Sequence, residues 1–152
     1  MRATVEIEAR DGAARAGRVV TARGAFASPA FMPVGTRGSV RGLGADDLDL
    51  LAPPVVLANT YHLMLRPGSD VVRDLGGLAR FTGWDGHSLT DSGGYQVFSL
   101  APKVDDEGAL FRSTYDGSSH HLSPESAAAI QADIGADIQI CLLYTSPSPR
   151  DS

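Results

Sequence analysis

Cysteine, clustered basic residues and long apolar runs are scarce in this chain of 152 residues. The single cysteine, Cys141, excludes an internal disulfide and fits a reducing compartment. The longest nearly apolar run, residues 50–58, is broken by two prolines and is far shorter than the roughly 20 residues that a membrane helix needs. Because Glu6 and Glu8 occupy the stretch where a signal peptide is apolar, we expect a cytoplasmic protein without membrane segments.

The charge balance argues mildly against a nucleic-acid binder, because the net charge is −5 and no cluster of Lys and Arg is present. Arg37 and Arg41 are close in sequence, but we interpret them as solvated loop residues. The glycine-rich segment 35–44 lacks the Lys-Ser/Thr ending of a P-loop and the strand-to-helix context of a dinucleotide site, so no nucleotide cofactor is indicated. With 43% hydrophobic and 20% charged residues, the composition is that of one ordinary globular domain.

Strand-like and helical patterns divide the chain into two kinds of structure. Residues 3–9 and 17–22 predict an antiparallel hairpin or small meander that forms a lid. Further along, helices are expected and alternate with strands that are apolar on both faces, which favours a parallel α/β sheet or barrel. An antiparallel hairpin turning at Asp116 and Gly117 interrupts this alternation. The predicted helices are 45–51, 69–78 and one N-capped by Ser123 and ended by Gly135, and the predicted strands are 55–58, 87–90 and 136–142.

The segment LTDSGGYQVFSL, residues 89–100, is the most informative part of the chain. It places an acid, a hydroxyl, two glycines, an aromatic ring and an amide together, from Asp91 to Gln96. These residues could form a pocket wall for a planar ligand, with Tyr95 as a stacking face and Asp91 and Ser92 reading a polar edge. A tight strand-to-helix turn capped by Asp91 explains the same residues equally well. Local chemistry leaves both interpretations open.

Other residues with possible chemistry are fewer. The segment 59–63 follows a strand as Asp91 does, so we expect the two to be neighbours in space. His62 there could be a general base, although a packed, hydrogen-bonded structural role is the better interpretation. His120 and His121 are adjacent on a strand and point to opposite faces, which disfavours a shared metal ion. Cys141 is interpreted as a small core residue.

Four segments together resemble the bacterial branch of the tRNA-guanine transglycosylase family. The similarity runs through most of residues 3–142, and four long motifs in the correct order are far more specific than any single one. The segments are SPAFMPVGTRGSVRGL (28–43), LANTYHLMLRPG (57–68), LTDSGGYQVFSL (89–100) and FRSTYDGSSHHLSPE (111–125).

This resemblance implies a (β/α)₈ TIM barrel with an N-terminal antiparallel cap, of which only the first part is present. It implies exchange of the wobble guanine of certain tRNAs for a 7-deazaguanine of the preQ1 or queuine type, in queuosine biosynthesis. Exchange would proceed by double displacement through a covalent RNA intermediate. The full-length family also implies a Zn²⁺ ion and a homodimer. Asp91 matches the family's general acid/base, Tyr95 matches the stacking aromatic, and Ser92, Gly93 and Gly94 line the same pocket.

The chain departs from the family pattern after residue 142. Where the family has an acidic base-reading residue and a cysteine, this chain continues with Leu143 and a Ser/Pro-rich tail. We therefore divide it into residues 1–142, the first part of the barrel domain, and a non-native tail, 143–152. The nucleophilic aspartate and the zinc ligands would lie beyond residue 152, so we expect the chain to be inactive, and its open sheet edge predicts aggregation or a molten state.

Two other classes of function compete with this interpretation. The first is a non-catalytic accessory paralogue that binds tRNA or a partner subunit, against which the presence of Asp91 and Tyr95 argues. The second is an unrelated barrel glycosidase, for which the sequence offers no second carboxylate at a strand end.

Overall fold

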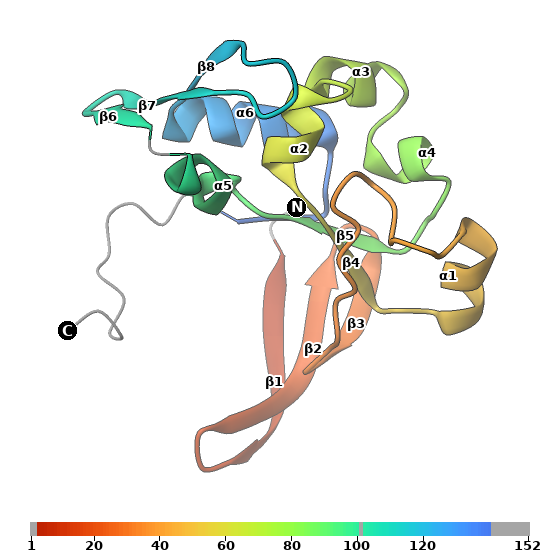
Figure 1. The fold of residues 1–152 in the computed structure, drawn as a ribbon. Helices are drawn as coiled ribbons and strands as arrows, with labels where there is room; N and C mark the ends of the chain where they lie inside the picture. The colour runs from red at the N-terminus through yellow and green to blue at the C-terminus, as the bar shows by residue number, and fades with distance from the viewer. Residues whose placement is uncertain (1–2, 101, 141–152) are drawn as a thin grey trace.

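The computed structural model of the chain describes residues 3–100 and 102–140 (Figure 1). Nine strands form three separate three-stranded sheets, and six helices lie among them in this described part. The strands are β1 Thr4–Asp11, β2 Ala14–Thr21, β3 Gly24–Ser28, β4 Val55–Ala58, β5 His87–Thr90, β6 Lys103–Asp105, β7 Gly108–Arg112, β8 Ser119–Leu122 and β9 Ile138–Gln139. The helices are α1 Ala45–Leu51, α2 Thr60–Leu65, α3 Ser69–Asp74, α4 Leu78–Thr82, α5 Gly94–Ser99 and α6 Pro124–Ile134.

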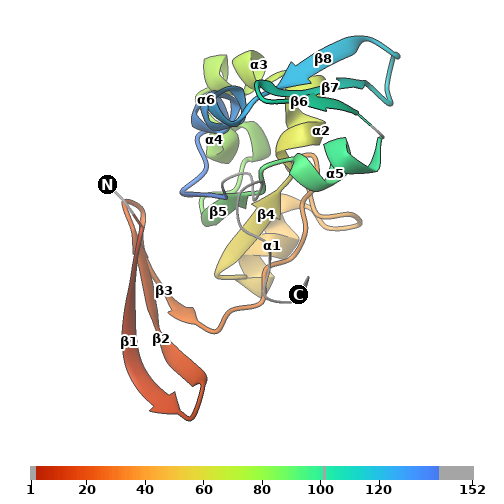
Figure 2. The same ribbon diagram turned by 90° about the vertical axis from the view of Figure 1, so that its left-hand side faces the viewer.

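The first sheet is the antiparallel meander β1–β2–β3, which projects away from the rest of the molecule (Figure 2). The predicted hairpin is confirmed, and β3 extends it into a meander. Its register shifts between Ile7 and Ala9. There the backbone of β1 lies so close to Gly17 that a Cβ on this residue would be 2.0 Å from the Glu6 carbonyl oxygen. Only glycine allows this approach.

The second sheet is parallel, in the order β4–β5–β9, and positions the candidate site. The predicted strands 55–58 and 87–90 are confirmed, and the predicted strand 136–142 is seen as the shorter β9, with residues 141–142 outside the described ranges. The described residues form an open sheet and no closed barrel. The outer edge of β4 is not bare, because Gly35 N donates to Leu57 O at 2.7 Å and Leu57 N donates to Pro33 O at 3.0 Å.

Three apolar clusters pack the helices against the sheets. One joins α2, α5 and α6 to the antiparallel sheet β6–β7–β8, and Tyr61 and Phe111 lie at its centre. A second, with Leu63 and Ile134, joins α2 and α6 to α3 and α4, and a third surrounds Trp84. Burying these side chains is the main favourable contribution to the packing of the short helices, which are too short to be stable alone.

Two of the three predicted helices are present as single helices, and the third is divided in two. Helix α6 is confirmed with both caps, since Ser123 Oγ accepts from Ser126 N at 3.1 Å and Gly135 adopts φ 74°. Helix 45–51 is also confirmed. The prediction of a single helix over residues 69–78 is wrong. Gly76 and Gly77, at φ 95° and 85°, interrupt the helix and separate α3 from α4. Two consecutive residues in this conformation cannot continue a right-handed helix.

Candidate functional site

Asp91 lies at the carboxyl end of β5 and is held by donors from two segments. Asn59 Nδ2 donates to its Oδ2 at 2.5 Å, and Thr60 N donates to its Oδ1 at 2.9 Å. Gly93 N donates to the same Oδ1 at 3.1 Å, and Thr60 Oγ1 donates to the Asp91 carbonyl oxygen. The expected proximity of the two strand ends is therefore confirmed, and the carboxylate of Asp91 is the atom group that joins them.

The first of these segments is helical, which the sequence interpretation missed. Asn59 is the N-cap of α2: its Oδ1 accepts from His62 N at 3.1 Å while its Nδ2 reaches Asp91. Asn before Thr at the end of an apolar strand is a capping pattern that could have revealed the helix.

The environment of Asp91 favours its protonated form more than water does. Burial is the largest effect and raises the pKa of Asp91 above the ordinary carboxyl value. Hydrogen bonds from the backbone of Thr60 and Gly93, and the nearby His62, lower this pKa in part. A carboxyl group with a raised pKa is better suited than an ordinary one to accept and return a proton.

The turn after Asp91 has a geometry that requires glycine. Gly93 is the N-cap of α5 at φ 73°, and a Cβ there would lie 3.0 Å from Tyr61 N and 3.2 Å from Tyr61 Cβ. Ser92 Oγ accepts from Gly94 N at 3.3 Å. The segment is therefore a strand-to-helix turn, as one of the two interpretations predicted, but Asp91 is not its cap, because Gly93 is the N-cap of α5 and no side chain caps this helix. The turn packs closely against the first turn of α2.

Helix α5 presents two side chains with different surroundings. Tyr95 is 81% exposed, so its ring is free to contact a ligand. Gln96 is half-buried, and among the described residues its Oε1 is buried without a hydrogen-bond partner. A buried acceptor without a donor is uncommon in folded proteins. The predicted roles of Ser92 to Tyr95 in substrate binding stay predictions, as does the role of Asp91 in catalysis.

His62 belongs to an aromatic and basic cluster next to Asp91. Its Nδ1 forms a hydrogen bond with Tyr115 Oη at 2.8 Å. The guanidinium carbons of Arg37 and Arg66 lie 4.9 and 5.1 Å from the centroid of the Tyr115 ring. Burial lowers the pKa of His62, the positive charge of Arg37 lowers it further, and Asp91 raises it in part. His62 is thus packed and hydrogen-bonded, as its structural interpretation predicted.

Arg37, Arg66 and Tyr115 come from three different segments of the chain. Sequence reasoning treated Arg37 as solvated and did not single out the other two. No local signal connects them, because Tyr115 follows β7 and approaches α2 only in the folded chain.

His120 and His121 are not part of this site. His120 stacks on Phe111 with ring centroids 5.8 Å apart, and His121 is exposed. Cys141 and the tail 143–152 lie outside the described residues. Across residues 3–100 and 102–140, no group of three or more His, Cys, Asp or Glu side chains could hold a metal ion, so these residues give the expected zinc no ligand set. In the same ranges no helix is long and apolar enough to cross a membrane.

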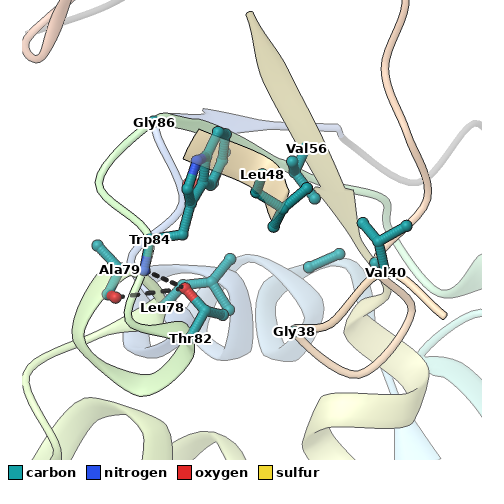
Figure 3. Close-up of a pocket in the computed structure, with 12 residues that line it drawn as sticks. Gly38, Val40, Leu48, Val56, Leu78, Ala79, Thr82, Trp84 and Gly86 are labelled. Atoms are coloured by element: carbon teal, nitrogen blue, oxygen red, sulfur yellow. Dashed lines mark hydrogen bonds between the residues drawn. The ribbon is translucent and has the colours of Figure 1, made fainter. Parts of the chain in front are cut away.

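An apolar cavity that Asp91 does not line lies beside the Trp84 ring (Figure 3). Leu48 of α1 and Val56 of β4 line it together with Gly38, and Trp84 N donates to Thr82 Oγ1 beneath the ring at 3.3 Å. Its volume of about 20 Å³ has room for one water molecule and none for a nucleobase. We therefore assign it to packing.

Comparisons with known proteins give a consistent result. The family model described as queuine tRNA-ribosyltransferase matches residues 11–152. The queuine tRNA-ribosyltransferase of Thermus thermophilus is 51% identical over 152 aligned residues, covering 96% of this chain and 39% of the relative. That of Koribacter versatilis is 56% identical over 135 residues, covering 88% and 35%. That of Acetivibrio thermocellus is 49% identical over 144 residues, covering 93% and 38%.

The chain spans 35–39% of the length of these curated relatives. The family model nevertheless covers nearly all of the chain, and it includes both strand ends that meet at Asp91. This chain therefore belongs to the queuine tRNA-ribosyltransferase family.

Proposed function

We propose that this chain provides the base-recognition half of a tRNA-guanine transglycosylase site. The reaction would exchange the wobble guanine of a tRNA for a 7-deazaguanine by double displacement. One observation supports this most: Asp91, a carboxyl group of raised pKa, lies at a parallel strand end, and the exposed Tyr95 follows it in the first turn of α5. Functional groups of α/β sheets and barrels collect at such strand ends.

The chemistry of the reaction explains why these residue types are needed. A base can be removed from a polynucleotide only after it leaves its stack, and the pocket must replace the lost stacking and hydrogen bonds. Tyr95 supplies a stacking face, and Asp91 accepts from ring N–H or amine groups of the purine edge. Ser92, Gly93 and Gly94 shape the turn between them and let the base approach the backbone.

Asp91 would also move the proton that the exchange requires. A departing guanine anion gains a proton and an incoming base loses one, so a single group that gives and then takes a proton serves both halves of the reaction. Asn59 Nδ2 and the Thr60 and Gly93 amides hold the carboxylate in place through both steps. The nucleophile and the zinc site are proposed to belong to the part of the family fold that these residues do not include.

The test uses a hybrid protein in which residues 1–140 of this chain replace the aligned residues of the Thermus thermophilus relative. The assay measures incorporation of labelled guanine into tRNA. Asp91→Asn should lower kcat by roughly 10²–10⁴-fold, which is the contribution of general acid/base catalysis. Asp106→Asn, in the exposed turn between β6 and β7, is the matched control and should leave kcat unchanged.

Comparable kcat values for the Asp91→Asn and Asp106→Asn hybrids would refute the role of Asp91. Full activity of the Asp91→Asn protein would also favour the accessory-paralogue alternative for this chain. The 152-residue chain by itself is expected to show no exchange, and measurable turnover would refute the division of the site between this chain and the rest of the fold.

A further inference from the structure

Two arginines converge on one tyrosine ring beside the Asp91 site. The guanidinium carbons of Arg37 and Arg66 lie 4.9 and 5.1 Å from the Tyr115 ring centroid, and both arginines are exposed. Attraction between the positive charge and the face of the ring helps to hold each guanidinium in place. The two like charges repel each other at the same time.

Neither arginine is neutralised by an acidic side chain of residues 3–100 or 102–140. In the described part of the chain the ion pairs are those of Arg23 and Arg73, and no carboxylate lies within 4.0 Å of either Arg37 or Arg66. In a protein of net charge −5, two guanidinium groups that share one tyrosine ring, with no described carboxylate within 4.0 Å, are a local excess of positive charge. A guanidinium group without an acidic partner is well suited to bind a phosphate through two parallel N–H donors.

The ring that organises the two arginines is fixed by the rest of the site. Tyr115 Oη is bonded to His62 Nδ1 at 2.8 Å, His62 N donates to Asn59 Oδ1 at 3.1 Å, and Asn59 Nδ2 donates to Asp91 at 2.5 Å. Three hydrogen bonds therefore connect the basic cluster to the Asp91 carboxylate. They pass through His62 of α2 and Asn59, the N-cap of the same helix. Its position relative to Asp91 is set by packing, since His62 and Tyr115 are half-buried.

From this arrangement we propose that Arg37 and Arg66, held on the Tyr115 ring, bind backbone phosphate of the RNA strand next to the nucleotide whose base enters the Asp91 site. This inference rests on the proposed function. An extruded base leaves its own phosphates outside the pocket, and positive charge at the rim holds the strand while the base is read. Arg37 and Arg66 are thus positioning residues, because they hold the strand and do not touch the reacting atoms.

The test measures the RNA affinity of the hybrid protein across a potassium chloride series. The probe is an RNA stem–loop with one guanine in its loop. For single-stranded RNA, log K falls with log[salt] with a slope of about −0.7 for each phosphate that the protein neutralises. The double variant Arg37→Gln/Arg66→Gln loses two such contacts, so its slope should be less steep by about 1.4. The KM of the hybrid for tRNA should rise while its KM for free guanine stays constant.

The matched control is Arg10→Gln/Arg15→Gln. These exposed arginines are opposite each other on β1 and β2, and their replacement removes the same total charge. An equal change of slope in the two double variants would show an effect of overall charge and would overturn the proposal. An unchanged RNA slope accompanied by weaker binding of inorganic phosphate alone would also overturn it, because the site would then hold a free anion.

A second RNA separates this inference from the proposed function. An abasic stem–loop, which lacks only the loop guanine, should bind more weakly than the intact one, and Asp91→Asn should remove that difference. Intact and abasic RNA could bind equally while the arginine variants still make the salt dependence of binding less steep. That result would refute base recognition by Asp91 and support the phosphate site. The midpoint temperature of thermal unfolding is measured for each variant. If it equals that of the unsubstituted protein, the arginine changes act on binding and not on folding.

Discussion

Replacing Gly93 by alanine tests whether the turn after β5 and the first turn of α2 are packed as one unit. Gly93 has φ 73°, a conformation that costs a residue with a Cβ roughly 1–2 kcal/mol. The new methyl group would lie 3.0 Å from Tyr61 N and 3.2 Å from Tyr61 Cβ. Tyr61 is 2% exposed and cannot move aside without stretching the bond from Thr60 N to Asp91. Overpacking of this kind costs about 1–3 kcal/mol, so the free energy of unfolding should fall by about 2–5 kcal/mol.

Gly117→Ala is the control that separates the two contributions. Gly117 has φ 74°, nearly the same as Gly93, but no atom lies within 4 Å of its added Cβ. Only the conformational cost applies, so a loss of about 1–2 kcal/mol is expected. Urea unfolding of the hybrid, followed by circular dichroism, measures both values. The Gly93 variant should also lose guanine exchange, since displacement of the turn moves the N–H that donates to Asp91. Equal destabilisation by the two substitutions would refute the close packing of this turn on α2.

Three further predictions concern charge and exposed apolar surface. Burial lowers the pKa of His62 in the folded state. As the pH falls below about 6.5, the unfolded state therefore binds a proton before the folded state does. The free energy of unfolding should decrease with falling pH from about 6.5 down to the pKa of His62 in the folded state. His62→Gln should flatten this part of the curve in urea unfolding at a series of pH values, and an unchanged slope would contradict the shift. Asp137 accepts from Arg23 Nε at 3.0 Å and Ser88 N at 2.9 Å, with its side chain 10% exposed, so Asp137→Ala should cost about 1–3 kcal/mol in the same assay. The exposed Arg73–Asp74 pair is its control, and Asp74→Ala should cost less than about 1 kcal/mol. The 152-residue chain alone should bind a hydrophobic dye and unfold without a sharp transition, and a cooperative transition of a monomer would refute this. The exposed apolar side chains behind that expectation include Phe31, Leu50 and Phe98.

Segments with strong local signals could be predicted from the sequence. The hairpin at the start of the chain, the strands around residues 55–58 and 87–90, and α6 with its Ser123 and Gly135 caps all follow from apolar periodicity and capping chemistry. The helices around Gly76 and Gly77 could not be separated in this way. Their boundary depends on a conformation that glycine permits but does not require.

The candidate site also has a part that the local sequence predicts and a part that only tertiary packing sets. The sequence alone determined the residues of the LTDSGGYQVFSL segment, their place after a buried strand and their likeness to one enzyme family, since these depend on local order along the chain. Only the tertiary structure decided that Asn59 and Thr60 hold the Asp91 carboxylate, and that Tyr115 gathers Arg37 and Arg66 beside it. These contacts join segments more than 20 residues apart, and hydrogen-bond geometry and burial are set by packing, which no local pattern encodes.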